Sequence, residues 1–442
     1  MLRKSFFALS TILVSLLFLN CSKVDDFEEN TPVKNDTIIS EEFETIHNNQ
    51  ILSNHSAFDI LKIIEDTDGF IIFSNVQVAT TDDIAAIRIS KIDNNFNEVW
   101  SFLINETDVL TESLFGVFDL PNNEFIAILN KGEYKLVGPR STTYALKFNS
   151  SGTILWKKQY KNEKPHNPSY YLSHDLPIQF DNESNELKFM MRTDSLNITT
   201  HMADQYFNEI TIDKDFNILK EEVLPYDATQ GYFLDRIKYD ELGNKYTYSG
   251  KYFIDYYVGT AAVISMQWYL MKYNLKNELV FEQDYGIERQ DEILDRILLD
   301  NNKIIAIGKY GEKGNKNLHR AIFQINNNNG GVNWNIIEDN HLFSSNSPTA
   351  STYIGCDIKF DDDGNYLVLF NDGTSGRSQT FNTATLIKIN KEGKIMWRFM
   401  DGEFENQDHF TPYNIFVKNN EYLIFGLKDN SKLWLKKIKL KL

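Results

Sequence analysis

The chain repeats one pattern along most of its length, with roughly 55 to 63 residues between successive copies. Each copy contains a strand-forming segment, a polar turn and a second strand-forming segment, which carries a tryptophan in the clearest copies. Those are residues 91–100, 147–156 and 388–397, and weaker copies lie at 211–219, 272–280 and 323–334. Because each copy must bury its apolar side against its neighbours, the repeat restricts the chain to a repetitive architecture.

A second landmark precedes each copy. It is a strand-forming segment, a tight acidic or asparagine turn and a strongly apolar segment, as at 63–73, 298–308 and 358–368. Strand formers on both sides of a short turn are typical of a β-hairpin. Each unit therefore has four strands, with short turns between the first and second and between the third and fourth. This predicts an all-β fold, the β-propeller, because a solenoid has a shorter period and a sandwich does not repeat.

The units begin near residues 57, 112, 172, 232, 292, 353 and 413, which predicts seven blades. Six or eight blades are alternatives, because the unit at 172–222 is irregular. The last unit ends one strand short of four. Residues 37–46 resemble a strand and precede the first full unit, so we expect them to supply the missing fourth strand and close the ring.

The turn and tryptophan near the end of the chain resemble the tryptophan-docking repeat of quinoprotein-like (PQQ-like) propellers. The matching residues are Asn390, Gly393, Lys394 and Trp397, with a partial match at Asn149, Gly152 and Trp156. The resemblance extends over most of residues 57–442 and implies the fold. It would also imply a quinoprotein dehydrogenase, a family in which a vicinal cysteine pair commonly stacks on the cofactor. Cys356 has no cysteine neighbour, so we expect neither that activity nor a cofactor.

The N-terminus has the features of an export signal. Arg3 and Lys4 form a basic start, and the mostly apolar run at 5–19 is shorter than the roughly 20 residues of a membrane-spanning helix. The run leads to Cys21 and resembles the lipobox of bacterial lipoproteins, although Asn20 replaces the usual small residue. The resemblance implies cleavage before Cys21 and a lipid such as palmitate on that cysteine. An ordinary signal peptide with a chance cysteine is the alternative.

The acidic residues 22–29 resemble the export signal of surface-exposed lipoproteins of Bacteroidetes. This resemblance implies a protein anchored to the outer membrane by its lipid and facing the cell exterior. A solvated acidic tether without a signalling role is the alternative. We therefore divide the chain into a signal peptide at 1–20, an acidic tether at 21–36 and a propeller domain at 37–442.

Charge and cysteine content narrow the partners further. The chain has 62 acidic and 45 basic residues and a net charge of −17, so it repels nucleic acid and we expect no nucleic-acid partner. With Cys21 lipidated, Cys356 is the other of only two cysteines and can form no intramolecular disulfide. We expect it to be an inert buried thiol, because it lies in an apolar segment.

Local motifs give little support for metal binding. Residues 361–365 look like a calcium loop, but turn residues fill the same slot in nearly every unit, so we interpret them as a turn. No two of the eight histidines are three to five residues apart, which leaves no local zinc motif. We therefore expect no metal site.

Two further repeated features have structural and functional interpretations. The tryptophans at 100, 156, 334 and 397 share one position in the repeat, so we expect them to pack between neighbouring blades. Leu-Asp-Arg-Ile occurs at 234–237 and 294–297, in the expected first strands. Its charged residues lie either beside the central channel or in ion pairs between blades; they are Asp235, Arg236, Asp295 and Arg296.

The connections from second to third strand and from blade to blade are long and differ between units. They are residues 131–143, 160–174, 192–206, 251–267, 341–352, 371–384 and 401–412. Variable loops on a rigid scaffold commonly bind ligands, and tyrosine combines contact area with a polar tip. We predict these ligand-binding residues: Tyr171, Tyr252, Tyr256, Tyr257, Phe381, His409 and Phe410. The alternative is that they only pack the loops against the blades.

Three functions follow from these observations. A non-catalytic surface lipoprotein that binds a glycan, a protein or a nutrient-uptake partner is favoured. A periplasm-facing scaffold for outer-membrane protein assembly is the second, by analogy with a barrel-assembly lipoprotein that has a quinoprotein-like propeller. A hydrolase or lyase with a site assembled across blades is the third.

Overall fold

The structure is a computed structural model of a chain in which residues Asn35–Leu442 form one compact unit. It describes residues 38–44, 57–77, 85–104, 111–135, 138–159, 178–181, 186–196, 203–224, 236–258, 261–285, 292–311, 318–338, 350–375, 380–401, 410–418, 421–428 and 432–440. Within these ranges no helix has the length and apolar character needed to cross a bilayer.

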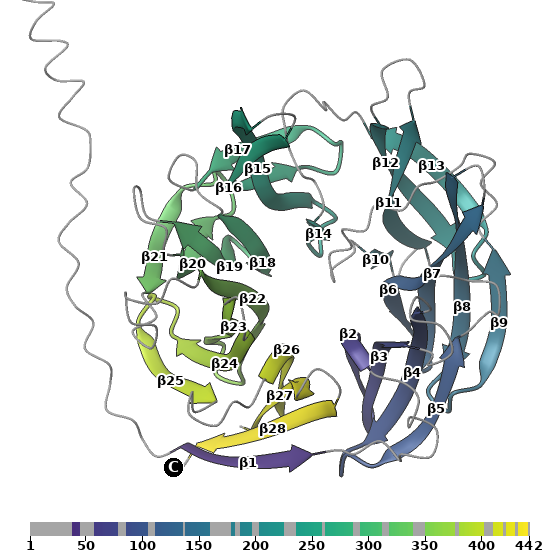
Figure 1. Ribbon diagram of the computed structural model, residues 1–442, viewed down its shortest axis with the longest axis horizontal. Helices are drawn as coiled ribbons and strands as arrows, with labels where there is room; N and C mark the ends of the chain where they lie inside the picture. Colours follow the sequence, from purple (N-terminus) through teal and green to yellow (C-terminus); the bar gives the residue numbers. More distant parts are fainter. Residues whose placement is uncertain are drawn as a thin grey trace, which may run out of the picture. The chain divides into compact units, whose positions relative to one another are not determined.

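The described elements are β-strands, arranged as seven antiparallel four-stranded blades in a ring (Figure 1). The predicted seven-bladed β-propeller is thereby confirmed. Blades 1 and 2 are also joined by one parallel backbone pair between Ala85 and Thr111.

Each blade has its first strand innermost and its fourth outermost. Blade 1 comprises β2 (Ala57–Asp66), β3 (Gly69–Gln77), β4 (Ala85–Asp93) and β5 (Glu98–Ile104). Blade 2 comprises β6 (Thr111–Leu120), β7 (Glu124–Lys135), β8 (Gly138–Asn149) and β9 (Ile154–Gln159). Blade 3 comprises β10 (Ile178–Asp181), β11 (Glu186–Leu196), β12 (Ala203–Asp213) and β13 (Ile218–Leu224). Blade 4 comprises β14 (Arg236–Tyr239), β15 (Lys245–Val258), β16 (Ala261–Tyr273) and β17 (Leu279–Asp284). Blade 5 comprises β18 (Ile293–Asp300), β19 (Lys303–Gly311), β20 (Leu318–Asn326) and β21 (Val332–Glu338). Blade 6 comprises β22 (Ala350–Phe360), β23 (Tyr366–Ser375), β24 (Thr380–Ile389) and β25 (Ile395–Asp401).

Blade 7 closes the ring with strands from both ends of the chain. It consists of β26 (Phe410–Lys418), β27 (Glu421–Lys428), β28 (Lys432–Leu440) and, as its outermost strand, β1 (Ile38–Glu44). β1 pairs antiparallel with β28 from Ile38 opposite Leu440 to Glu44 opposite Trp434. The expected closure by the segment at 37–46 is therefore confirmed.

One turn recurs between the third and fourth strands and explains the repeat in the sequence. In blade 1, Asp93 Oδ1 accepts hydrogen bonds of 2.8 Å from the N–H groups of Asn95 and Asn97. The fourth turn residue, Phe96, has the left-handed φ of 65° that closes the turn. The same bonding occurs around Asn149, Asp213, Asn274 and Asn390.

The tryptophans pack between blades, as predicted. Trp100 of blade 1 lies over Gly152 of blade 2, where an added Cβ would approach Trp100 Cδ2 to 2.7 Å. The Trp100 indole N–H donates a 3.0 Å hydrogen bond to the carbonyl oxygen of Ser150 in the same turn. Related contacts join Phe281 to Gly330, Trp334 to Gly393, Trp156 to Phe216 and Trp397 to Tyr422.

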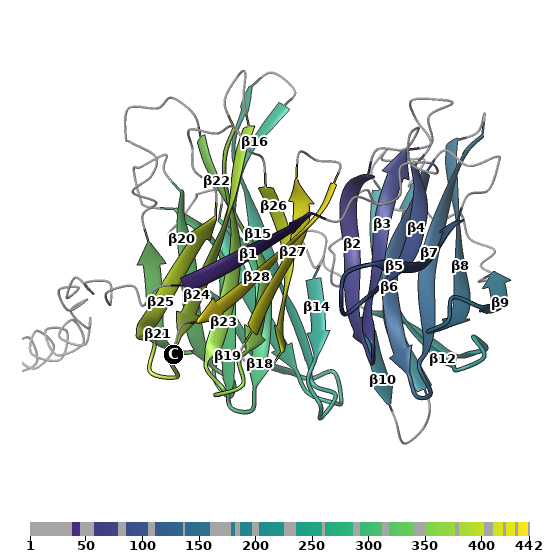
Figure 2. The same cartoon turned by 90° about the horizontal axis from the view of Figure 1, so that it is seen from below.

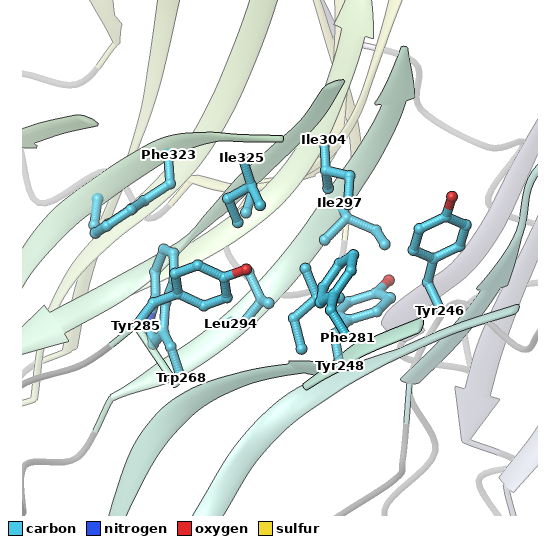
Figure 3. Close-up of a cluster of buried hydrophobic side chains, with 13 residues drawn as sticks. Tyr246, Tyr248, Trp268, Phe281, Tyr285, Leu294, Ile297, Ile304, Phe323 and Ile325 are labelled. Atoms are coloured by element: carbon cyan, nitrogen blue, oxygen red, sulfur yellow. The ribbon is translucent and has the colours of Figure 1, made fainter. Parts of the chain in front are cut away.

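In the described residues, clusters of buried apolar side chains join blades 1 and 2, 2 and 3, 4 and 5, 5 and 6, 6 and 7, and 7 and 1. Figure 3 shows the cluster between blades 4 and 5, in which Trp268 and Tyr248 of blade 4 pack near Leu294 and Phe323 of blade 5. The ring centroids of Trp268 and Phe323 are 4.9 Å apart. The core is thus distributed around the ring, and each blade is rigid because its neighbours hold it.

The two ends of the blades differ, as expected. One end carries the turns between first and second and between third and fourth strands, and we call it the short-turn face. The other carries the connections between second and third strands and between blades, and we call it the hairpin face (Figure 2).

The expectation of long loops on the hairpin face is wrong in four places. Paired strands occupy much of the predicted loops at 131–143, 192–206, 251–267 and 371–384. At 251–267 the physical reason is composition, because aromatic and β-branched residues favour extended pairing over loop structure. In the other three segments the second and third strands continue their backbone pairing, which satisfies polar backbone groups. The hairpin face therefore presents extended β-hairpins rather than irregular loops.

Candidate functional site

The hairpin of blade 4 extends well beyond the rest of its blade. β14 pairs with β15 only from Lys245 to Tyr248, and β17 pairs with β16 only from Tyr269 to Tyr273. The pairing of β15 with β16 continues to Val258 opposite Ala261. Among the described residues no other strand pairs with 251–258 or 261–267, which we call the blade 4 ribbon.

The blade 4 ribbon stands on a rigid base. Trp268 follows it on β16, is fully buried and donates its indole N–H to the carbonyl oxygen of Lys309 in blade 5. Gln267 is also buried. The register of the ribbon shifts between Ile254 and Tyr256, and a β-bulge of this kind bends and twists a strand.

Three of the predicted binding residues lie together on the blade 4 ribbon. Its register places Tyr252 opposite Met266, Tyr256 opposite Val263 and Tyr257 opposite Ala262. The structure therefore brings Tyr252, Tyr256 and Tyr257 onto one projecting element. Their role in binding stays a prediction.

The other predicted residues are spread out. Phe381 lies on β24 opposite Thr374, near the tip of the blade 6 hairpin. Phe410 begins β26, is only 4% exposed and packs against Trp434 with ring centroids 5.1 Å apart. This burial favours the packing alternative for Phe410. Cys21, Tyr171 and His409 lie outside the described residues.

The charged residues of the inner strands join blades to one another. Arg236 of blade 4 donates to the carbonyl oxygen of Leu294 at 2.8 Å and to Asp295 Oδ1 at 3.1 Å. The other oxygen of Asp295 accepts a 2.8 Å hydrogen bond from the N–H of Gly355 in blade 6.

Arg296 continues this pattern with a 3.1 Å hydrogen bond to the carbonyl oxygen of Cys356. These contacts support the interpretation of Arg236, Asp295 and Arg296 as links between blades, while Asp235 lies outside the described residues.

A second buried charge network, between blades 5 and 6, has no sequence motif. Arg320 contacts Asp372 at 3.1 Å and Glu338 at 3.6 Å, and Arg398 also pairs with Glu338. Asp372 is fully buried and accepts a hydrogen bond from the Thr385 hydroxyl. Burial raises the pKa of Asp372, and the Arg320 charge opposes that rise. Sequence reasoning missed this network because its members lie on separate strands.

The suspected calcium loop is a turn of the recurring type. Asp361 Oδ1 accepts hydrogen bonds from the N–H groups of Asp363 and Asn365 at 3.0 and 2.7 Å, and its Oδ2 pairs with Lys388. Both oxygens thus have protein partners. The part of the chain that the structure describes contains no group of three or more candidate metal ligands.

Cys356 has the environment expected of an inert thiol. It is buried and packs with Leu367 and Leu369 of the same blade. Burial raises the pKa of its thiol far above the ordinary value, which disfavours the reactive thiolate.

Comparison with known proteins finds similarity only among solved structures. No family model matches the chain, and no curated protein matches it. Similar solved structures include the complex of Drosophila plexin A with semaphorin 1b, at 9% identity and a TM-score of 0.44, covering 92% of this chain and 88% of that one. An ulvan lyase is 10% identical with a TM-score of 0.43, and the match covers 76% of this chain and 77% of that one. An endo-arabinase from Bacteroides thetaiotaomicron is 13% identical with a TM-score of 0.34, and the match covers 77% of this chain and 96% of that one. The likeness is one of fold.

Proposed function

We propose that this protein is a lipid-anchored binding protein of the outer membrane that faces the cell exterior and captures a glycan or protein partner with its hairpin face. The observation that carries the binding role is the blade 4 ribbon with Tyr252, Tyr256 and Tyr257. The base of the ribbon is held in the ring by Trp268, and tyrosine is a residue type that supplies contact area at low entropic cost.

The anchoring part of the proposal rests on the N-terminal sequence. Cys21 follows an apolar run of export-signal length, and the acidic residues 22–29 follow it directly. A diacylated cysteine holds a protein on a membrane because two acyl chains bind far more tightly than one.

The blades support binding through their rigidity rather than through reactive groups. Arg236 and Asp295 are engaged in contacts between blades 4 and 5, and Asp295 continues the link to blade 6. A scaffold braced in this way keeps its projecting hairpins in fixed relative positions, which favours recognition of a large partner.

The location is tested by protease shaving of intact cells, followed by blotting for the protein. A control strain carries Lys23→Ala, Asp25→Ala and Asp26→Ala, which remove the expected export signal. We expect cleavage of the wild type and protection of the control. Protection of both, with cleavage after lysis, would overturn the surface location and support the periplasmic assembly scaffold instead.

The binding role is tested with a triple variant, Tyr252→Ala, Tyr256→Ala and Tyr257→Ala. Wild type and variant are compared on arrays of purified glycans and in crosslinking on intact cells. We expect loss of captured partner with an unchanged unfolding midpoint. A Tyr→Phe triple variant is the matched control, and full binding by the alanine variant would contradict the role of the ribbon.

A further inference from the structure

Exposed apolar side chains follow the third-to-fourth turn at the short-turn face in blades 1 to 6; they are Val99, Ile154, Leu155, Ile218, Leu219, Leu279, Val280, Val332 and Met396. Blades 3 and 4 hold four of them, and blade 4 adds Leu242 and Leu275 from its two turns. We call the set on blades 3 and 4 the apolar rim; it consists of Ile218, Leu219, Leu242, Leu275, Leu279 and Val280. Leu242 and Leu275 are 75% and 72% exposed, the highest values among the exposed large hydrophobic side chains of the described residues. Single exposed leucines are ordinary on protein surfaces, and exposed residues at the start of the fourth strand recur in several blades. The two leucines in the turns therefore distinguish blade 4 from the other blades.

The recurring turn does not require these leucines. Leu242 is the third residue of the turn that begins at Asp240, and the same position in other turns holds Asn95, Ser151, Asp215, Lys276, Asn328, Asp363 or Glu392. Leu275 is the second residue of its turn, where the others hold Asn94, Ser150, Lys214, Glu241, Asn327, Asp362 or Lys391. Among the described turns of this type, only those of blade 4 have an apolar residue at the second or third position, where the other turns have polar residues.

The two leucine-bearing turns are neighbours. Lys245, just after the first turn, donates a 3.1 Å hydrogen bond to Asn277 Oδ1 in the second. Leu279 and Val280 follow that second turn directly at the start of β17. The exposed aliphatic side chains of blade 4 therefore belong to one continuous part of the short-turn face.

The chain leads toward its lipid anchor from this same face. Ile38 is the first residue of β1 and lies opposite Leu440, at the end of β28. This end of blade 7 also carries the short turn at which Lys418 pairs with Glu421, so Ile38 lies at the short-turn face. Blade 7 lies across the ring from blade 4 (Figure 1). Sixteen residues lie between Cys21 and Ile38, so the seventeen Cα–Cα steps of the tether reach at most about 60 Å.

We propose that the apolar rim inserts its leucines into the surface of the lipid bilayer that holds Cys21. This inference rests on the lipid anchor of the proposed function. The tether below blade 7 and the rim below blade 4 then support the ring at two opposite sides. The short-turn face lies on the membrane, and the hairpin face with the blade 4 ribbon points away from it.

The surroundings of the rim specify the kind of lipid surface. Glu241, Glu278, Lys220 and Lys276 adjoin the exposed aliphatic residues, so the rim carries charges of both signs, and the whole chain has a net charge of −17. A rim of mixed charge gives no electrostatic attraction to anionic headgroups, and the net negative charge of the chain opposes them, so the contact is apolar and fits a bilayer of zwitterionic lipids. We expect it to persist at high salt, since apolar burial is not screened.

The test uses the acylated full-length protein in phosphatidylcholine vesicles that contain a nitroxide-labelled lipid. A fluorophore is attached through Leu242→Cys, Leu275→Cys or, as the control, Ile354→Cys. Ile354 is also exposed, at 49%, but lies on the innermost strand of blade 6. Wild type serves as the labelling blank, because its Cys356 is buried and its Cys21 carries lipid in this proposal.

We expect the nitroxide lipid to quench the fluorophore at 242 and at 275 but not at 354, at both low and high salt. Co-flotation of the protein with the vesicles without quenching at 242 and 275 would overturn the rim contact and leave the anchor intact. Failure to co-float would overturn both the anchor and the rim contact.

Discussion

At the residue scale, the recurring turn uses aspartate and asparagine interchangeably. Asp93 and Asp213 accept the same two backbone hydrogen bonds as Asn149 and Asn390. The essential group is therefore the side-chain oxygen that both residue types share, and the charge is secondary. The natural repeats thus supply matched controls for mutation.

We expect Asp213→Ala to lower the free energy of unfolding by about 1–2 kcal/mol, because the N–H groups of Asp215 and Asn217 lose their acceptor. Asp213→Asn should stay within about 0.5 kcal/mol of wild type, since it keeps that acceptor. Urea unfolding of the three proteins measures both values. Equal losses in the two variants would contradict the shared-oxygen interpretation.

The same position gives a pH dependence with a definite sign. Burial raises the pKa of Asp213, but hydrogen bonds from Asn217 and Asp215 outweigh it and hold the pKa below its ordinary value. The stabilisation is therefore present above the unfolded-state pKa of about 3.9 and is lost as the pH falls through the folded-state value. Unfolding measured between neutral and acidic pH should show wild type losing stability relative to Asp213→Asn, and parallel curves would contradict this.

Glycine under a docked tryptophan is a second residue-scale constraint. Gly393 has φ 87°, and a Cβ there would lie 2.7 Å from Trp334 Cδ2. Gly364 has a similar φ of 75°, but its nearest neighbour is the flexible end of Lys391 at 3.3 Å. Comparison of the two glycines separates backbone strain from a steric clash.

We expect Gly393→Ala to destabilise the protein by about 1–3 kcal/mol more than Gly364→Ala, because only the first forces the tryptophan to move. Thermal unfolding and the fluorescence of Trp334 measure the effect. Equal destabilisation would indicate that the positive φ alone requires glycine.

The limits of sequence reasoning are also visible at this scale. The turn residues and Trp100 could be predicted because their pattern is local and repeated. The pairing of Arg320 with Asp372 could not, because the partners are 52 residues apart and only the packing of two blades brings them together. The burial of Phe410 could not be predicted either, because the residues around it in the sequence resemble a loop.

At the element scale, the structure has paired strands in places where the sequence predicted loops. The segment at 251–267 is rich in tyrosine, isoleucine and valine, so it continues the hairpin of β15 and β16 instead of forming a loop. Its aromatic and β-branched residues fit both a binding loop and a strand, and the backbone pairing shows the strand. The placement of Tyr252, Tyr256 and Tyr257 on one ribbon depends on this pairing.

We expect the blade 4 ribbon to be dispensable for folding. Replacement of residues 251–267 by a two-residue Asn-Gly turn retains Trp268 and its packing on blade 5, so the unfolding midpoint should change by only a few degrees. Partner binding should be abolished. A matched shortening of the blade 2 hairpin at 133–140 serves as the control and should leave binding intact, whereas binding by the blade 4 deletion would contradict the proposed site.

At the scale of the whole molecule, the ring depends on pairing between its first and last strands. β1 forms seven residue pairs with β28, and the described residues show no other strand on the outer side of β28. Closure was predictable from the sequence because the last unit is one strand short. The extent of each hairpin and the charged links between inner strands were not, since they arise only when blades meet.

We expect the double variant Ser40→Pro and Glu41→Pro, in the middle of β1, to open the closure, because the N–H groups of consecutive residues point alternately to β28 and to solvent. Proline cannot donate to the ladder, so the variant should lose several kcal/mol of unfolding free energy, about 3 kcal/mol by analogy with proline in other regular elements. Hydrogen exchange should show faster exchange in β28 than in the other third strands. Unchanged protection of β28 would contradict closure by β1.

The direction of β1 has a mechanical consequence. β1 starts at the short-turn face, from which the tether leaves, and runs toward the hairpin face, where a partner would be held. A pull between the membrane and that partner would act lengthwise along β1 against β28. Seven backbone pairs would then resist together in shear rather than unzip one after another, so in the proposed surface location the ring closure would also bear mechanical load.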